Sequence, residues 1–201
     1  MCALMEDCED EGAMYAAPLL MTKRLVLGAP RPCHIDQIVT LANNKRVAEM
    51  LATMPHPYNQ SCAEQWIATG RKSRDHVPRR FAIFLRNQPE TLIGACGIGA
   101  FDESGQCHLG YWIGEPHWGN GYATEAAQTI VDFAFEVTKL STITCACRVT
   151  NPASRRVIEK CGFQYTDMMM FHSMGAGGQV AAQRYALDRS TWRSLKAWGH
   201  S

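Results

Sequence analysis

Two glycines, Gly119 and Gly121, stand directly before a helical pattern and are the residues with the clearest chemical use in this chain. The first turn of a helix exposes unpaired backbone N–H groups and the positive end of the helix dipole. Glycine lets the backbone come close to an anion and permits positive φ angles that turn the N–H groups inward. The pair therefore indicates a phosphate-binding turn, and a plain tight turn is the alternative.

The elements that must position this turn lie on either side of it. Leu109, Tyr111 and Ile113 alternate with polar or small residues, as in a half-buried strand. After the turn the residues repeat at helical spacing. One predicted face of this helix holds Ala123, Ala126 or Ala127, Ile130 and Ala134, and the opposite face holds Glu125, Gln128, Asp132 and Glu136. The unit is a strand, a glycine turn and a helix.

The rest of the chain predicts an α+β fold with a mixed sheet, because three consecutive strands precede a strand–helix–strand–helix–strand order. Asn151 and Pro152 open one of the later helices, whose buried positions we expect to be Ala153, Val157 and Cys161. Ser61 with Glu64 resembles a capping box that opens an earlier helix. The other expected elements are strands at 25–27, 81–85, 92–98, 143–149, 163–170 and 180–187, a helix at 34–52, turns at 55–59 and 102–105, and a short helix around 192–195.

Length and composition indicate one globular domain, since 201 residues with 46% apolar composition can bury a sizeable core. Residues 1–20 are acidic without balancing bases and predict a disordered tail, which leaves 21–201 as the single domain; Met21 is an alternative start. Without the five acids of the tail, 14 acidic and 20 basic side chains give the domain a charge of +6, which suits a polyanionic ligand.

Several classes of protein are disfavoured. No stretch interleaves clustered lysine and arginine with aromatic residues, so we expect no nucleic-acid partner. No apolar run has the length of a membrane span and no secretory signal is visible, so we expect a cytoplasmic protein without a membrane partner. The nine cysteines form no CxxC pair, and we expect buried small apolar residues rather than disulfides, a metal site or a catalytic thiol, with Cys145 and Cys147 on one strand face.

Two segments in the right order carry a family resemblance. GYWIGEPHWGNGYATEA, followed about thirty residues later by NPASRRVIEKCGF, resembles the GNAT superfamily of acetyl-CoA-dependent N-acetyltransferases, and within it the branch of the RimJ and RimL ribosomal-protein acetyltransferases. The resemblance covers about residues 22 to 190. It implies the GNAT fold, a mixed and mostly antiparallel sheet splayed at its centre with flanking helices, and acetyl-CoA lying in that opening, with no metal.

The resemblance also implies which residues bind the cofactor. The family's pyrophosphate loop falls on residues 118–123, where Trp118 replaces the usual Gln or Arg. Trp112 and Ile113, at the end of the preceding strand, would offer backbone groups to the pantetheine arm, which binds like an added strand. The cofactor-binding residues implied are Trp112, Ile113, Trp118, Gly119, Asn120, Gly121, Tyr122, Ala123, Thr124, Asn151 and Ser154.

Two residues are implied as catalytic. The family's base often lies on the strand before the loop, where this chain has His108, and a histidine with an ordinary pKa near 6.5 suits the removal of a proton from an amine. A solvated strand residue is the alternative. The tyrosine that often protonates the CoA thiolate is replaced by Ile158, and Ser154 of the branch's N-x-x-S pattern is the candidate in its place. A serine that bonds its own backbone is the alternative.

The sequence thus predicts an N-acetyltransferase that moves the acetyl group of acetyl-CoA directly to a primary amine. The acceptor is either a protein N-terminus or a small molecule such as a polyamine, an amino acid or an aminoglycoside, and a homodimer is possible. The alternative is a module that binds acyl-CoA without catalysis. A hydrolase that pairs Cys96 or Cys161 with His108 lacks any third residue or oxyanion context.

Overall fold

A computed structural model of the chain describes residues 18–70, 80–100 and 107–198. The predicted turn at 102–105 and most of the predicted acidic tail lie outside these residues. Leu20, the last residue of that predicted tail, belongs to the first strand. None of the described helices is long and apolar enough to cross a membrane.

The described strands form one mixed sheet, as predicted, in the order β1-β2-β3-β4-β5-β6-β8-β7. All neighbouring strands are antiparallel except β5 and β6, which are parallel. The three strands β3, β4 and β5 form the expected antiparallel meander. The strands are β1 (Leu20–Met21), β2 (Leu25–Gly28), β3 (Arg80–Leu85), β4 (Gln88–Ala100), β5 (Cys107–Ile113), β6 (Thr142–Arg148), β7 (Gln164–Ser173) and β8 (Gly178–Asp188).

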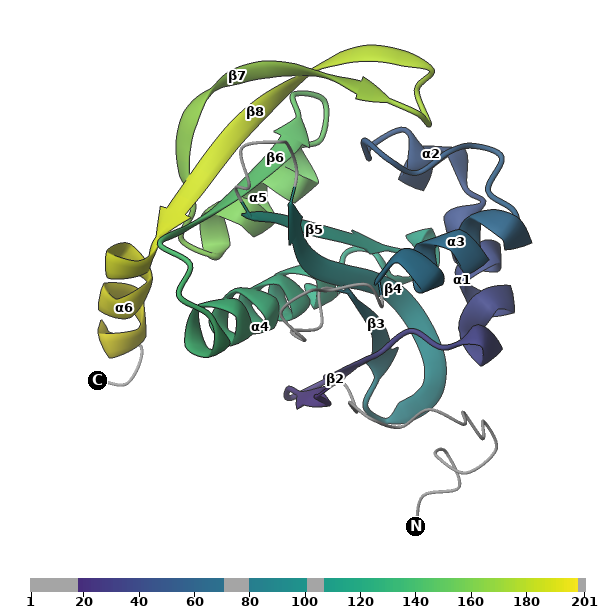
Figure 1. The fold of residues 1–201 in the computed structure, drawn as a ribbon, viewed down its shortest axis with the longest axis horizontal. Helices are drawn as coiled ribbons and strands as arrows, with labels where there is room; N and C mark the ends of the chain where they lie inside the picture. The colour runs from purple at the N-terminus through teal and green to yellow at the C-terminus, as the bar shows by residue number, and fades with distance from the viewer. Residues whose placement is uncertain (1–17, 71–79, 101–106, 199–201) are drawn as a thin grey trace.

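The sheet is splayed at its centre, which confirms the predicted fold class. The strands β5 and β6 share only two register pairs, Cys107 with Ile143 and His108 with Thr144, and then diverge (Figure 1). Beyond these pairs, no other strand of the described residues pairs with that edge of β5. An open edge of this kind can pair with an extended ligand.

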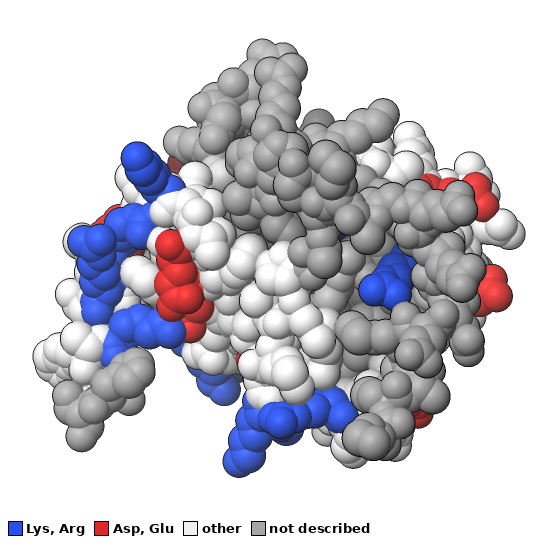
Figure 2. Space-filling model, turned by 60° about the horizontal axis from the view of Figure 1, so that its bottom comes forward, with Lys and Arg blue, Asp and Glu red and all other residues white. Residues whose placement is uncertain are grey.

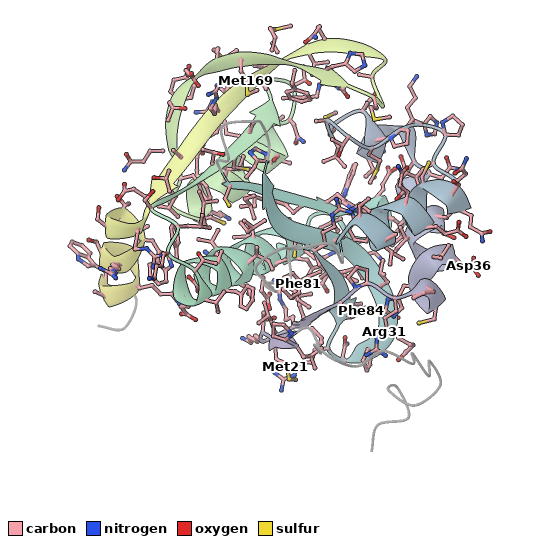
Figure 3. All side chains as sticks on the ribbon, viewed as in Figure 1. Met21, Arg31, Asp36, Phe81, Phe84 and Met169 are labelled. Carbon is pink, nitrogen blue, oxygen red and sulfur yellow. The ribbon has the colours of Figure 1, made fainter. Side chains whose placement is uncertain are left out.

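Helices cover the two faces of the sheet and bury two separate clusters. The helices are α1 (Ile35–Ala42), α2 (Lys45–Ala48), α3 (Gln60–Gly70), α4 (Tyr122–Val137), α5 (Pro152–Lys160) and α6 (Arg189–Trp198), with 3-10 turns η1 (Pro32–His34) and η2 (Glu115–His117). Phe81 and Phe84 of β3 point to opposite faces (Figure 3). Phe81 packs with α4 and α5 residues, whereas Phe84 packs with α1 and α3 residues.

The helix predicted over 34–52 is broken near its middle. The helix α1 ends at Asn43, and Asn44 opens α2 by accepting a hydrogen bond from the Arg46 amide at 2.9 Å. Asparagine side chains bond nearby backbone groups and so compete with a continuous helix. The apolar spacing continues across the break, which is why the pattern alone predicts one helix.

Two further details of the helices differ from the prediction. Asn59, not Ser61, caps α3, because its Oδ1 accepts from the Cys62 amide at 3.1 Å and the helix begins at Gln60. In α5 the fully buried residue is Ile158, while Ala153 is exposed and lines a cleft. The inward face of α5 is therefore turned by about one residue from the predicted one.

The C-terminal hairpin arches over the sheet and reaches α2. The tip between β7 and β8 lies beside the segment after α2 (Figure 1), where the Met174 amide donates to Ala52 O at 2.9 Å and Ser173 Oγ donates to Leu51 O at 2.7 Å. Met168 and Met170 of β7 are exposed, so these two methionines do not belong to the core. The hairpin thus joins the C-terminal part of the sheet to the segment after α2 above the splayed strands.

Candidate active site

A cleft of about 1560 Å³ lies where β5 and β6 diverge. It reaches from the N-terminus of α4 and from α5 on one face of the sheet to α3 and the segment after α2 on the other. The cleft brings together all but one of the residues predicted for cofactor binding or catalysis. The exception is Asn120, whose side-chain amide donates back to His117 O and Trp118 O at 3.2 and 3.1 Å.

The glycine turn has the conformation of an anion-binding loop. Gly119 and Gly121 have φ angles of +80° and +77°, which L-residues with side chains rarely adopt. Gly121 is the N-cap of α4. The first backbone hydrogen bond of α4 runs from the Glu125 amide to Gly121 O at 3.2 Å, so the amides of the first turn have no partner within the helix. The predicted cradle therefore has the required backbone geometry.

Arg24, which the sequence did not single out as a site residue, holds this loop in place. Its Nη1 donates to Asn120 O at 2.8 Å, and its Nε donates to Glu125 Oε2 at 2.7 Å. The guanidinium also lies 4.8 Å from the centre of the Tyr122 ring. Arg24 directly precedes β2 and is about one hundred residues from the loop in sequence, so no local pattern reveals the contact.

Glu125 is the carboxylate that joins β2 to the first turn of α4. It accepts from Thr22 Oγ1 at 2.5 Å and from the Arg24 amide at 2.9 Å, besides the Arg24 side chain. Burial raises the pKa of Glu125, but the hydrogen bonds from Thr22 and Arg24 outweigh it and leave this pKa below its ordinary value. These contacts give Glu125 a structural role, because they fix the start of α4 to the residues before β2.

The backbone of β5 alternates in direction, and this decides which residues face the cleft. Because the Gly114 amide donates to Ile93 O at 2.8 Å, Gly114 and Trp112 direct their backbone groups to β4. Tyr111 and Ile113 direct theirs to the open side. The backbone groups of Ile113 and Tyr111, rather than those of Trp112, therefore face the open side, where the sequence predicts that the pantetheine arm binds.

Trp118 is tied to the same strand end. Its Nε1 donates to Ile113 O at 2.6 Å, so one of the open backbone groups of Ile113 is already occupied. The Trp118 ring is 41% exposed and carries the Arg46 guanidinium 5.4 Å from its centre. This tryptophan closes the end of the open edge and fixes the start of the glycine loop relative to β5.

His108 lies at the bottom of the splay, in the last register pair that β5 makes with β6. Thr144 Oγ1 donates to Cys107 O at 3.1 Å and lies 3.5 Å from His108 Nδ1. His108 borders the cleft beside Thr144, and an imidazole there is of a type that can exchange a proton with an amine.

Ser154 and Asn151 face the cleft from the start of α5. Asn151 caps the helix by accepting from the Ser154 amide at 3.0 Å. Ser154 Oγ lies 2.8 Å from the hydroxyl of Tyr111, which crosses the gap from β5. Burial raises the pKa of Tyr111 far above its usual value, so this hydroxyl stays protonated and remains a hydrogen-bond donor. Tyr111 was predicted only as a strand residue, and its spacing carries no signal for this pairing.

Four of the seven cysteines among the described residues are buried, whereas Cys33 is exposed and Cys62 and Cys107 are half-buried. Cys145 and Cys147 are both buried on one face of β6, as predicted. Burial raises the pKa of the Cys161 thiol to about 12 and also raises that of Cys145, which disfavours the reactive thiolate. Among the described residues, no three His, Cys, Asp or Glu side chains gather as a metal site.

The splayed sheet, the glycine loop at a helix N-terminus and the polar pair at the second helix define the class of acetyl-CoA-dependent acetyltransferases. The family described as acetyltransferase (GNAT) domain matches residues 24–164 of the chain. The chain therefore belongs to the GNAT acetyltransferase family, which confirms the resemblance drawn from the sequence.

Relatives fit the same family. The uncharacterized N-acetyltransferase p20 of Bacillus licheniformis is 29% identical over 109 residues, which are 54% of this chain and 61% of that protein. The ribosomal-protein-serine acetyltransferase of Escherichia coli is 28% identical over 82 residues, 40% of this chain and 46% of that protein. The match thus spans about half the length of these relatives, and the second is consistent with the RimJ and RimL branch.

Solved structures show the same fold. The spermidine N-acetyltransferase of Vibrio cholerae, solved with CoA and spermine, superposes with a TM-score of 0.70 at 21% identity. The superposition covers 86% of this chain and 99% of that one. At this level of identity the similarity establishes the fold and leaves the acceptor to the residues of the site.

Proposed function

We propose that this protein is an N-acetyltransferase that moves the acetyl group of acetyl-CoA directly to a primary amine. The observation that carries the proposal is a single cleft in which the open edge of β5, the glycine loop of α4 and the side chains of His108 and Ser154 meet. The exposed first turn of α4 suits a pyrophosphate, and the edge of β5 suits an extended pantetheine arm. The cleft passes through the sheet, so an amine can approach the thioester from the opposite face.

The side chains of the cleft can carry the required proton transfers. The amine nitrogen attacks the thioester carbonyl, the C–S bond breaks, and the amine loses one proton while the CoA thiolate gains one. His108 is the group that takes the proton from the amine. Ser154 Oγ lies 2.8 Å from the Tyr111 hydroxyl, and in this pair either hydroxyl can donate, so the serine can give its proton to the sulfur when the tyrosine proton is directed to it. The Tyr111–Ser154 pair would thus protonate the thiolate in place of the family tyrosine, whose position holds Ile158 in this chain.

The amine acceptor is proposed to be either a protein N-terminus or a small molecule. The Escherichia coli relative is named for a ribosomal protein, and the Vibrio cholerae structure holds spermine. Both a protein N-terminus and a small amine thus have precedent among similar proteins. A module that binds acyl-CoA without catalysis is the second candidate, since Ser154 is a weaker acid than tyrosine. A cytoplasmic location and a homodimer stay predictions from the sequence.

The test is thermal unfolding with and without saturating acetyl-CoA, because it needs no knowledge of the acceptor. A ligand of the native state at about 100 times its Kd adds roughly 2.7 kcal/mol, which raises the midpoint by roughly 5 to 10 °C for a chain of this size. Gly121→Glu should abolish the rise, because it adds a side chain and a negative charge at a positive φ angle. Gly178→Glu, with open space around the added Cβ, is the matched control.

The outcomes separate the candidates. A rise that Gly121→Glu removes and Gly178→Glu keeps supports cofactor binding in the cleft, and mass spectrometry of amines incubated with enzyme and acetyl-CoA then shows whether transfer occurs. Binding without transfer to any peptide or small amine would favour the non-catalytic module. No rise in the midpoint would overturn both.

A further inference from the structure

The end of the cleft that faces away from α4 and α5 has apolar and aromatic walls. These walls come from the segment after α2, from α3 and from β7. Their main side chains are Met50, Met54, Tyr58, Trp66, Phe171 and Met174. His56 and Asn59, which lie on either side of Tyr58 in the turn predicted at 55–59, are exposed and do not border it. This acceptor end is therefore suited to apolar surface rather than to water.

The C-terminal hairpin covers this acceptor end. Besides the bonds of Ser173 and Met174 to the segment after α2, Arg148 donates from β6 to the backbone carbonyl of Glu49. Ser173 is fully buried in this contact. A substrate at this end therefore lies against the hairpin, and its atoms in contact with these walls lose water.

Charge is distributed unevenly in the cleft. Among the described residues that line it, Glu49 is the one carboxylate, whereas the cations are Arg46, Arg80, Arg156 and Lys160. Arg156 and Lys160 belong to α5 on the cofactor side. At the acceptor end, Glu49 has Arg148 bound to its own backbone, and Arg80 donates to Thr69 Oγ1 at 2.7 Å with its guanidinium 5.5 Å from the centre of the Trp66 ring.

A polyamine or an aminoglycoside needs more carboxylate partners than the described lining of this end supplies, where Glu49 is the one carboxylate. Each additional ammonium group that loses water requires such a partner, because an unpaired buried charge is costly. Arg80, which lines the same end, would instead repel a second cation. An apolar or aromatic body finds matching walls in the same place.

We propose that the acceptor is an amine with an apolar or aromatic body and no second cation near the amino group. Such an acceptor is either a free monoamine or the first residue of a polypeptide with an apolar side chain. The proposal rests on the proposed acetyl transfer and narrows its substrate class.

Matched acceptors test the proposal. Hexylamine and 1,6-diaminohexane have the same carbon chain and differ by one ammonium group, and phenethylamine adds an aromatic body. We expect kcat/KM for the two monoamines to exceed that for the diamine by roughly tenfold or more, in line with about 1.4 kcal/mol for an unpaired charge. Two peptides that begin with Leu or with Lys and are otherwise identical test the polypeptide source in the same way. A diamine or a Lys-first peptide that is preferred would overturn the proposal.

A pair of variants tests the charge argument directly. Met50→Glu adds a carboxylate to the wall, and Met50→Gln adds a side chain of the same size without charge. We expect Met50→Glu to raise the diamine-to-hexylamine ratio of kcat/KM by about three- to fivefold, the scale of one partly exposed ion pair. Met50→Gln should leave the ratio unchanged. An equal ratio in both variants would show that charge at this wall does not select the acceptor.

The proposed function is checked separately by the acetyl-CoA-dependent rise in unfolding temperature and by CoA release with any amine. Cofactor binding and turnover with a reversed preference would refute only the acceptor class. Cofactor binding without turnover of any amine or peptide would refute the transfer reaction itself.

Discussion

His108 is the residue on which removal of the amine proton depends in the proposed mechanism. We predict that His108→Ala lowers kcat by about one to three orders of magnitude, the scale of a lost general base, while the Kd for acetyl-CoA hardly changes. Steady-state kinetics and calorimetry measure the two quantities. His172→Ala is the control, because His172 is an exposed histidine of β7 outside the cleft lining. An unchanged kcat in His108→Ala would remove this histidine from the mechanism.

Tyr111 and Ser154 act as one unit if the hydroxyl pair at 2.8 Å orients the serine proton. Tyr111→Phe keeps the buried ring and removes only the hydroxyl, and we predict a fall in kcat of about three- to thirtyfold, the worth of one or two hydrogen-bond energies. Ser154→Ala should cost as much or more, and the double variant should cost no more than Ser154→Ala alone. If the fall in kcat of the double variant equalled the product of the two single-variant falls, the two hydroxyls would act independently.

The pH profile distinguishes this hydroxyl from a titrating acid. Because burial raises the pKa of Tyr111, the hydroxyl keeps its proton through neutral and moderately alkaline pH. Wild type and Tyr111→Phe should therefore differ by a constant factor of kcat between about pH 6 and pH 9. A difference that vanishes on the alkaline side would mean that Tyr111 loses its proton in this range.

At the scale of elements, the contact between β2 and α4 decides how the phosphate loop is held. We predict that Glu125→Gln lowers the unfolding midpoint at pH 7 by about 2 to 4 °C, since the Arg24 side chain is 45% exposed and solvent reduces the worth of the pair to about 1 kcal/mol. The KM for acetyl-CoA should rise severalfold because Asn120 loses its support. Glu136→Gln, an exposed position at the other end of α4, should change neither quantity.

The pH dependence of this effect has a definite sign. The folded-state pKa of Glu125 is below its ordinary value of 4.5, so the unfolded chain binds more protons in the window between the two values. The contribution of Glu125 is complete above that ordinary value and is lost as the pH falls through the lower, folded-state pKa. The midpoint difference between wild type and Glu125→Gln should therefore shrink on acidification. A difference that grows toward low pH would contradict the assigned hydrogen bonds.

The sequence predicts elements and local turns well, because their patterns lie within a few residues. The strand, glycine turn and helix at 107–136 and the antiparallel meander follow from alternation and helical spacing. The helix break at 43–44 and the cap at Asn59 depend on asparagine side-chain hydrogen bonds. In the sequence alone, a continuous helix and a cap at Ser61 fit equally well. The partners Arg24 and Tyr111 depend on contacts across about 100 and 43 residues, which no local pattern encodes.

At the scale of the whole molecule, the two halves of the sheet, β1–β5 and β6–β8, make few contacts at the centre. They meet a second time at the tip of the β7–β8 hairpin. Two register pairs between β5 and β6 leave the site open, and the tip of the β7–β8 hairpin closes the far side on α2. Figure 2 shows that on one face the described Lys and Arg side chains lie in separate groups, and that acidic side chains lie beside one of these groups. The described part of that face thus forms no continuous basic stripe for nucleic acid.

Gly175 tests whether the hairpin shapes the acceptor end. A Cβ at Gly175 would lie 2.4 Å from the backbone carbon and oxygen of Ala48, so Gly175→Ala must push the tip away from α2. A Cβ at Gly178 meets nothing within 4 Å, which makes Gly178→Ala the matched control.

We predict that Gly175→Ala lowers the unfolding midpoint by about 2 to 8 °C, for an overpacking cost of roughly 1 to 2 kcal/mol. The KM for a monoamine acceptor should rise about fivefold or more as apolar contact with Phe171 and Met174 is lost, while the Kd for acetyl-CoA stays the same. The cofactor binds between β5, α4 and α5, which the displaced tip does not touch. If acetyl-CoA binding weakened with the acceptor KM unchanged, the hairpin would belong to the cofactor side of the cleft, and the division of the cleft into two ends would be wrong.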